Sequence, residues 1–173
     1  AGVPAGVFNM VNGDGPGFGT ILSSHPDIDV VSFTGSTRAG ILISKAAADT
    51  VKTVSLELGG KSPNLVFNDT DVDAAVARGA SFCFANTGQS CNAATRMLVE
   101  RDAYERAVEV AAATAEATVV DLPSKTGGHI GPLVSQVQFD KVQGLIQAGI
   151  DEGARLVAGG TGPPRAVSQE HSR

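Results

Sequence analysis

The fold is decided around the stretch Phe33-Thr34-Gly35-Ser36-Thr37-Arg38-Ala39-Gly40, in which an apolar run ends at a glycine and a helix-forming run begins. The apolar residues before the glycine predict a strand over residues 28–33, and the run after it predicts a helix that reaches Ala48. The free N–H groups at the start of such a helix can bind an anion such as a pyrophosphate. Ser36 or Thr37 could equally be an ordinary N-cap, and taken alone the stretch favours that simpler interpretation.

Strand and helix patterns alternate on both sides of this stretch, which predicts an α/β fold. Further strands are predicted over residues 7–11, 53–58, 64–67, 95–99 and 155–158. Further helices are predicted to end near Ser24, to carry an apolar face from Val72 to Cys83, and to span residues 102–117 and 136–151. The 21 glycines suit this fold class, because strand-to-helix turns and close helix packing favour small residues.

The composition is that of a globular protein, and it argues against several kinds of partner. With 173 residues and 42% hydrophobic content, the chain is long enough for one domain with a sizeable core. A net charge of −5 and the absence of tryptophan argue against nucleic acid, which needs basic surfaces or aromatic stacking platforms. No apolar run approaches the roughly 20 residues of a membrane helix, and no signal peptide is visible. We therefore expect a cytoplasmic protein with no membrane partner.

A second stretch, Asn86-Thr87-Gly88-Gln89-Ser90-Cys91-Asn92-Ala93, delivers a cysteine in a small polar turn after a helix-like run. Backbone N–H groups in such a turn can stabilise a thiolate nucleophile and the oxyanion that forms when it attacks a carbonyl. An arbitrary cysteine is more often buried and inert, but the polar neighbours of Cys91 favour exposure. Cys83 lies on the apolar face of its helix and is predicted to be a core residue. We expect both thiols to be reduced.

A third stretch, Glu57-Leu58-Gly59-Gly60-Lys61-Ser62-Pro63-Asn64, places a carboxylate at the end of a strand and two glycines close behind it. We interpret Glu57 as a shielded strand-end carboxylate, where loss of water would favour the neutral acid and suit a general base. A lone glutamate on a strand is otherwise a solvated surface residue. The pairing with a cysteine turn favours the first interpretation.

In their order and spacing, these three stretches resemble the signature sites of the NAD(P)-dependent aldehyde dehydrogenase superfamily. The resemblance implies an incomplete fold of that family, with parts of a Rossmann-like cofactor domain and of an α/β catalytic domain. Residues 1–57 would be the C-terminal half of the dinucleotide-binding domain, and residues 58–160 the N-terminal part of the catalytic domain. Residues 161–173 depart from the family pattern, and we expect a disordered, truncated or frame-shifted tail there.

The resemblance implies the oxidation of a small-molecule aldehyde to a carboxylate with NAD or NADP. Cys91 would attack the aldehyde, the thiohemiacetal would pass a hydride to the nicotinamide, and Glu57 would activate the water that hydrolyses the thioester. By the same likeness, nine residues would border the cofactor. Gly35, Ser36 and Gly40 would line the pyrophosphate, Thr34 and Leu58 would approach the nicotinamide, and Gly13, Gly15, Pro16 and Ala39 would border the adenine.

The resemblance covers only the middle of a family member, so the chain begins as though cut from something longer. The family's upstream oxyanion asparagine, its ribose-binding residues and its oligomerisation hairpin have no counterpart here, although the family is homo-oligomeric. We therefore expect poor stability of the chain on its own. Two alternatives stay open: an inactive remnant or interaction module, and a semialdehyde dehydrogenase that transfers the acyl group to coenzyme A. Glu57 favours water as the acceptor.

The remaining polar clusters are given structural roles. The acids of residues 69–73 lack the glycine and glutamate of a calcium loop and are interpreted as helix caps, and residues 102–105 resemble a capping box. The glycine-rich residues 12–19 would be an ordinary turn without the other motifs. The segment 130–135 resembles a structural part of the family's catalytic domain. The histidines fit no metal-ligand spacing and no catalytic triad, so no metal is expected: His25, His129 and His171.

Overall fold

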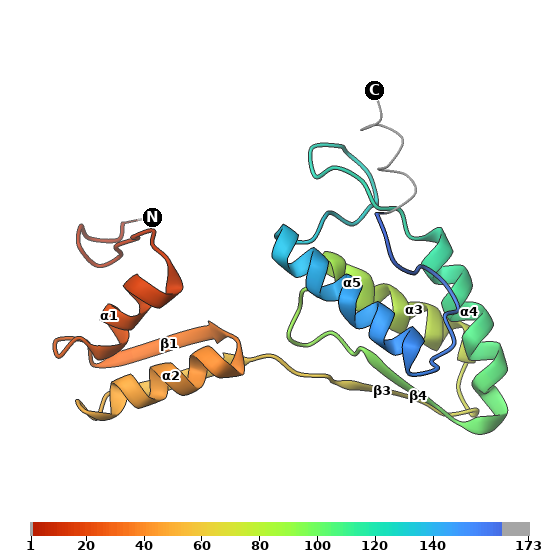
Figure 1. The fold of residues 1–173 in the computed structure, drawn as a ribbon, viewed down its shortest axis with the longest axis horizontal. Coiled ribbons are helices and arrows are strands. Elements are labelled where there is room, and N and C mark those ends of the chain that lie inside the picture. The colour runs from red at the N-terminus through yellow and green to blue at the C-terminus, as the bar shows by residue number, and fades with distance from the viewer. Residues whose placement is uncertain (1, 164–173) are drawn as a thin grey trace. The chain divides into compact units, whose positions relative to one another are not determined.

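The computed structural model describes residues 2–163, and this part of the chain divides into two compact units between Gly59 and Gly60. Helices and strands alternate in both units, so the predicted α/β class is confirmed (Figure 1). None of the helices in the described range combines the length and the apolar character needed to cross a membrane.

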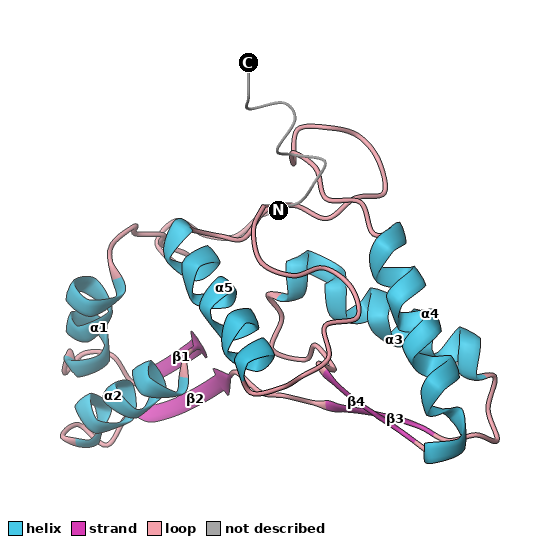
Figure 2. Ribbon diagram, turned by 45° about the vertical axis from the view of Figure 1, so that its right-hand side comes forward, coloured by secondary structure: helices cyan, strands magenta, loops and turns pink. Residues whose placement is uncertain are grey.

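The N-terminal unit is built on one parallel strand pair and its crossover helix. A π-helical turn, Gly15–Gly19, leads into the short helix α1, Thr20–Ser24. Strand β1, Val30–Gly35, is joined to strand β2, Thr53–Leu58, by helix α2, Thr37–Ala48. The two strands pair in parallel from Val30 opposite Thr53 to Gly35 opposite Leu58, and α2 packs against both (Figure 2). This is the strand–helix–strand unit that the alternating pattern predicts.

Alternation along β2 decides which side chains α2 covers. Val54, Leu56 and Leu58 are half-buried, whereas Ser55 and Glu57 between them are exposed. Ala47 of α2 is completely buried. The connection after α2 is tied back to the end of α1, because the buried Lys52 donates from Nζ to the carbonyl of His25 at 2.6 Å. The turn, the helices and the strand pair therefore form one packed unit.

The C-terminal unit contains a second parallel strand pair. Strand β3, Pro63–Val66, is joined by helix α3, Val72–Phe84, to strand β4, Arg96–Val99, with Pro63 opposite Arg96. Helix α4, Tyr104–Ala117, packs along α3, and helix α5, Gln136–Asp151, follows a long loop. The core of the unit is formed by Val66, Val76 and Ala107, with partly buried apolar residues of α3, β4 and α4 packed around them.

Several boundaries and caps agree with the sequence predictions. Strand β2 and helix α5 have the predicted bounds, α1 ends at Ser24, and α2 ends at Ala48. Asp71, one of the acids interpreted as caps, accepts the N–H of Ala74 at the start of α3. After α5, Gly153 has a φ of +90°, a left-handed conformation that glycine adopts easily at the end of a helix.

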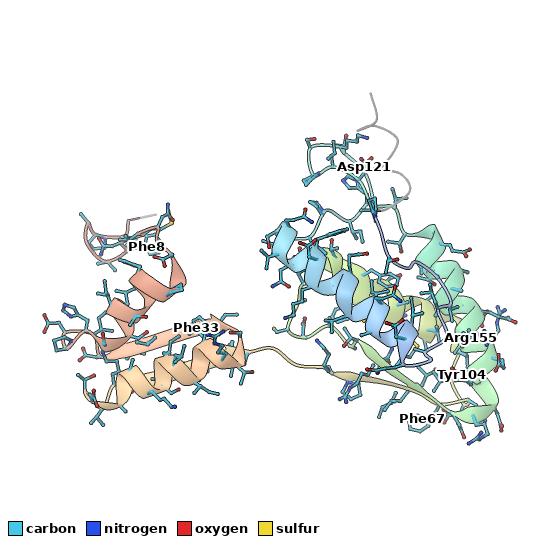
Figure 3. The ribbon with its side chains drawn as sticks, in the orientation of Figure 1. Phe8, Phe33, Phe67, Tyr104, Asp121 and Arg155 are labelled. Carbon is cyan, nitrogen blue, oxygen red and sulfur yellow. The ribbon has the colours of Figure 1, made fainter. Side chains whose placement is uncertain are left out.

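Two predicted strands are wrong. Residues 7–11 form no strand, and their apolar side chains are exposed, including Phe8 at 77% (Figure 3). Residues 155–158 form none either, and Leu156 is 52% exposed. The physical reason is the same in both cases, because no strand in the described residues is hydrogen-bonded to either segment and an unpaired strand leaves its backbone groups unsatisfied.

Two further predictions concern helix ends and the tail. The capping box at residues 102–105 is wrong: a 3₁₀ turn, Arg101–Ala103, precedes α4, so Ala103 occupies the N-cap and no side chain caps the helix. The tail predicted for residues 161–173 lies largely outside the described residues. Within the described part, the N–H of Gly162 donates to the side-chain oxygen of Gln143 on α5.

The connection between α2 and β2 contains a strained residue whose replacement should stabilise the N-terminal unit. Val51 has a φ of +53°, a left-handed conformation that is unfavourable for a β-branched residue. Its side chain is 90% exposed, so no packing contact offsets that strain. We expect Val51→Asn to raise the free energy of opening of β2 by about 1 kcal/mol, because asparagine tolerates this conformation. Hydrogen exchange of the β2 amides measures it. Val51→Thr keeps the branch and should give no gain; an equal gain in both variants would contradict the strain argument.

Candidate functional site

The start of α2 combines a capped helix with free backbone donors. Ser36 occupies the N-cap, with its side-chain oxygen accepting the N–H of Ala39 at 3.2 Å and its carbonyl accepting the N–H of Gly40 at 3.0 Å. The N–H groups of Thr37 and Arg38, at the first two helical positions, have no acceptor within a helix and lie at the positive end of its dipole. The cap predicted for Ser36 is confirmed, and the donors that suit an anion are present beside it.

Strand register brings most of the predicted cofactor residues to this same edge. Thr34 pairs with Glu57 and Gly35 pairs with Leu58, at the carboxyl ends of β1 and β2. A side-chain Cβ added at Gly40 would lie 3.0 Å from a methyl carbon of Leu58, so a larger residue here would require the Leu58 side chain to shift. The crevice at the carboxyl ends of parallel strands is where nucleotide ligands bind in such folds. Six predicted residues lie here: Thr34, Gly35, Ser36, Ala39, Gly40 and Leu58.

The other three predicted cofactor residues lie in the turn before α1. The carboxylate of Asp14 accepts the N–H of Gly17 at 3.0 Å, and Gly15 and Pro16 open the π-helical turn. Gly13 lies beside Phe18, because an added Cβ would come within 2.8 Å of that side chain. The structure thus gives this turn a local packing role, and the adenine contact of Gly13, Gly15 and Pro16 stays a prediction.

The shielding predicted for Glu57 is wrong. Its side chain is exposed, because the alternation of β2 turns it away from the face on which Leu56 and Leu58 meet α2. An exposed carboxylate stays in contact with water, so the loss of water that the prediction required is absent. The local sequence misled the prediction, since glycines after a strand end remove covering side chains rather than add them.

The turn that carries Cys91 has an unusual backbone. After α3 ends at Phe84, Asn86, Thr87 and Gly88 are left-handed in succession, with φ values of 50°, 57° and 73°. A β-branched residue such as Thr87 rarely adopts this conformation. Three residues later, the thiol of Cys91 is free and exposed, as the sequence predicts. The backbone carbonyl oxygen of Cys91 lies near Gly60. A Cβ atom added at Gly60 would be 3.8 Å from that oxygen.

Side chains within the turn bond to its own backbone. The amide of Asn86 donates to the carbonyl of Gln89 at 3.1 Å, and the amide of Gln89 donates to the carbonyl of Asn86 at the same distance. Ser90 donates from its hydroxyl to the side-chain oxygen of Asn92 at 2.8 Å, and Ala93 after it is buried. The polar residues around Cys91 are therefore structural members of the turn as well as a polar surround for the thiol.

Two long-range hydrogen bonds, which the sequence analysis missed, attach this turn to the loop before α5. The hydroxyl of Thr87 donates to the carbonyl of Gly131 at 2.8 Å, and the side-chain oxygen of Gln89 accepts the N–H of Val134 at 2.8 Å. These contacts join residues 44 and 45 positions apart, so no local pattern indicates them. The resemblance of residues 130–135 to a structural segment was the one available signal.

The two cysteines differ in environment. Cys83 is half-buried on α3, and burial raises the pKa of its thiol because the charged thiolate loses water. Cys91 is exposed. Both are free thiols in this structure. Any reagent that requires an accessible thiolate should meet Cys91 first.

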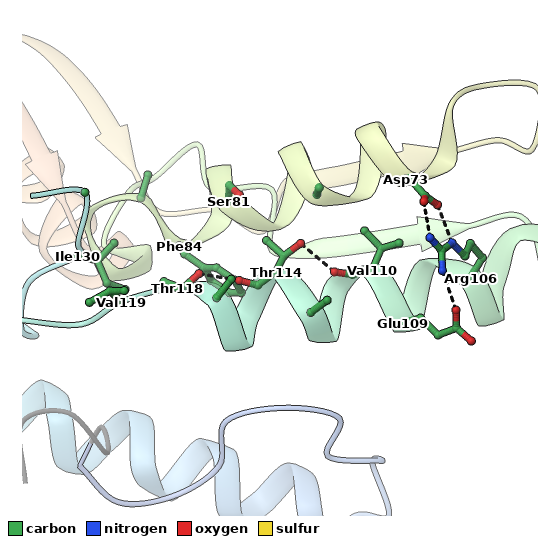
Figure 4. A pocket seen from close by; sticks show the side chains of 15 residues that line it. Asp73, Ser81, Phe84, Arg106, Glu109, Val110, Thr114, Thr118, Val119 and Ile130 are labelled. Atoms are coloured by element: carbon green, nitrogen blue, oxygen red, sulfur yellow. Dashed lines mark hydrogen bonds and ion pairs between the residues drawn. The ribbon is translucent and has the colours of Figure 1, made fainter.

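A groove lies between α3 and α4, apart from the cysteine turn (Figure 4). It has a volume of about 880 Å³ and is lined mainly by small apolar and hydroxyl side chains. At one end, Arg106 bridges Asp73 of α3 and Glu109 of α4, which holds the pKa of Asp73 below its usual range. The groove contains no cysteine or histidine, so the nucleophile candidate lies elsewhere.

The aldehyde dehydrogenase family model matches residues 1–171. The chain belongs to the aldehyde dehydrogenase family. It is 53% identical to a 3-succinoylsemialdehyde-pyridine dehydrogenase of a Pseudomonas species, over 94% of this chain and 34% of that protein. It is also 47% identical to the mitochondrial aldehyde dehydrogenase of Equus caballus, over 92% of this chain and 32% of that protein. The chain thus spans about a third of the length of the curated aldehyde dehydrogenases it matches.

Solved aldehyde dehydrogenases share the fold of the chain. The crystal structure of the enzyme from Bartonella henselae matches with a TM-score of 0.91 and 58% identity, over 94% of this chain and 34% of that one. Aldehyde dehydrogenase C of Pseudomonas syringae, solved as a C291A mutant with NAD+ and octanal, matches with a TM-score of 0.93 and 49% identity, over 97% of this chain and 35% of that one. The predicted partial aldehyde dehydrogenase fold is confirmed.

The contrast between the cysteines predicts selective alkylation. At about pH 7, iodoacetamide should label Cys91 at least about fivefold faster than Cys83, because Cys83 is partly covered and its raised pKa leaves less thiolate. The ratio should shrink as the pH rises through the pKa of Cys83, where the buried thiol ionises. Mass spectrometry of the two cysteine peptides from one digest measures both rates. Equal labelling at neutral pH would show that the turn does not present Cys91 as described.

Proposed function

We propose that this chain carries the nucleophile and the cofactor-binding edge of an enzyme that oxidises an aldehyde to a carboxylate with NAD(P)+. The observation that carries the proposal is the free, exposed thiol of Cys91 on a turn held by its own side chains, in a chain of the aldehyde dehydrogenase family. Exposure of a structured thiol is what a nucleophile needs and what a packing cysteine lacks.

The proposed reaction begins at the sulfur of Cys91. The thiolate adds to the aldehyde carbon, the C=O bond becomes a C–O⁻ oxyanion, and backbone N–H groups of the turn stabilise that charge. The oxyanion collapses as the carbon loses its hydrogen with an electron pair, which leaves a thioester on Cys91. If NAD(P)+ is held at the carboxyl ends of β1 and β2, its nicotinamide would supply the hydride acceptor that this step requires. Water then cleaves the thioester and releases the carboxylate and the thiol.

Glu57 is proposed as the base that takes a proton from that water. Its exposed side chain is accessible to the water on which a general base would act. The support for this role is that residues 57–64 resemble a signature site of the family to which the chain belongs. If coenzyme A replaced water as the acceptor, the product would be an acyl thioester and Glu57 would have no water to activate.

The carboxyl edge of β1 and β2 is proposed as the cofactor site. The capped start of α2 offers the N–H groups of Thr37 and Arg38 to a pyrophosphate, and Gly40 keeps the space between α2 and β2 narrow. The Pseudomonas syringae relative was solved with NAD+, as was a betaine aldehyde dehydrogenase from Staphylococcus aureus. NAD or NADP is therefore the cofactor class that we propose. The substrate is a small-molecule aldehyde, and the free thiols suit the cytoplasm.

The cofactor proposal predicts the effect of one backbone N–H. Thr37→Pro removes the donor at the first helical position but leaves α2 intact, because proline is tolerated there and Ser36 already has an extended ψ of 149°. We expect it to weaken NAD+ binding at least about fivefold, measured by ligand-detected NMR titration of the chain. Thr37→Ala keeps the N–H and should bind as the parent does. Equal NAD+ affinity of the parent and Thr37→Pro would contradict the proposal that the pyrophosphate binds at this edge.

The nucleophile proposal predicts the loss of aldehyde oxidation when the thiol is replaced. Cys91→Ser should lower NAD(P)-dependent oxidation of a small aliphatic aldehyde by at least about 1,000-fold, whereas Cys83→Ser should change it less than about threefold. NAD(P)H absorbance and the acid product measure the rate, with and without coenzyme A to identify the acceptor. Equal rates in Cys91→Ser and the parent would end the proposal. A parent chain without activity would favour the alternative of an inactive remnant or interaction module.

A further inference from the structure

We propose that Thr87 and Gln89 are positioning residues that hold the cysteine turn in its reactive shape by clamping it to residues 131–134. The proposal rests on the proposed role of Cys91 as nucleophile. It assigns to these two side chains a task beyond folding, because they lie four and two positions before the thiol and bond to a segment remote in the sequence.

Thr87 occupies a conformation that its own side chain disfavours. Its φ of 57° is costly for a β-branched residue, and it follows Asn86 in the same conformation. The hydroxyl of Thr87 is partly buried and donates to the carbonyl of Gly131 at 2.8 Å. A left-handed threonine persists where its surroundings hold it, so this bond identifies residue 131 as the external support of the turn.

Gln89 uses both ends of its side-chain amide. Its oxygen accepts the N–H of Val134 at 2.8 Å, and its nitrogen donates to the carbonyl of Asn86 at 3.1 Å. Asn86 returns a bond to the carbonyl of Gln89, so the two residues lock the turn internally while Gln89 also reaches the neighbouring loop. Gln89 itself is half-buried, and its side chain thus joins the turn to the loop through two hydrogen bonds.

Together the two bonds fix the direction in which the backbone enters Cys91. Backbone N–H groups of the turn would stabilise the thiolate and the oxyanion. A change in the backbone direction of the turn would therefore point these donors away from the sulfur and the oxyanion. The clamp should therefore control the reactivity of Cys91 without touching substrate or cofactor. A purely structural role predicts something different, namely that loosening the turn changes stability and exposes both cysteines alike.

The test compares alkylation rates of the two cysteines in variants of the full chain. Thr87→Val keeps the branched shape and removes only the hydroxyl, and Thr87→Ser restores a hydroxyl. Thr114→Val is the matched control, because the Thr114 hydroxyl also donates to a carbonyl at 2.8 Å but lies on α4. We expect Thr87→Val to slow iodoacetamide labelling of Cys91 at about pH 7 by about threefold or more, with Cys83 unchanged. Thr87→Ser and Thr114→Val should label Cys91 as the parent does.

Gln89→Met supplies an independent arm with the same length of side chain and no polar atoms. It should slow Cys91 labelling and also speed hydrogen exchange of the Val134 amide, which loses its acceptor. The clamp is refuted if Thr87→Val and Thr114→Val behave alike, or if both cysteines in the Thr87 and Gln89 variants are labelled faster together. Labelling does not require aldehyde oxidation, so an active Cys91→Ser variant would end the proposed function, whereas these rates would still report on the clamp.

Discussion

The C-terminal unit depends on a backbone constraint: three left-handed residues in succession must be tolerated between α3 and the cysteine turn. Glycine at residue 88 and asparagine at residue 86 tolerate this conformation, but the β-branched Thr87 adopts it at a cost. The strain is opposed by hydrogen bonds from Asn86, Thr87 and Gln89, two of them to a loop more than forty residues away. The direction of the thiol is thus a property of the unit rather than of the local sequence.

The N-terminal unit is also built on a parallel strand pair, which here positions the start of a helix. A parallel strand pair brings the ends of β1 and β2 to one edge, and the helix between them starts there with its positive dipole end. Gly40 allows that helix to lie against Leu58. One unit therefore presents backbone donors for an anion, and the other presents a thiol. In the proposed function, anion binding therefore belongs to the first unit and the nucleophilic thiol to the second.

The sequence predicts well wherever the structure is decided by local periodicity. The bounds of β2 and α5, the cap at Ser36 and the exposure of Cys91 all follow from residue patterns within one or two turns of chain. Prediction from the sequence fails where the structure of a segment depends on other segments that pack against it. Residues 7–11 look like a buried strand but have no neighbouring strand in the described chain, and Glu57 is exposed because of the face it occupies. The bond from Thr87 to Gly131 had no local pattern to reveal it.

The buried amino group of Lys52 can serve as a probe of local opening in solution. Acetylation requires access of the reagent to that nitrogen, and burial limits access while Lys52 donates to the His25 carbonyl between α1 and the α2–β2 connection. Lysines at the surface would react with an acetylating reagent directly. The rate at which Lys52 is modified would therefore report how often α1 separates from the α2–β2 connection. This one amine is a chemical probe for local opening of the N-terminal unit.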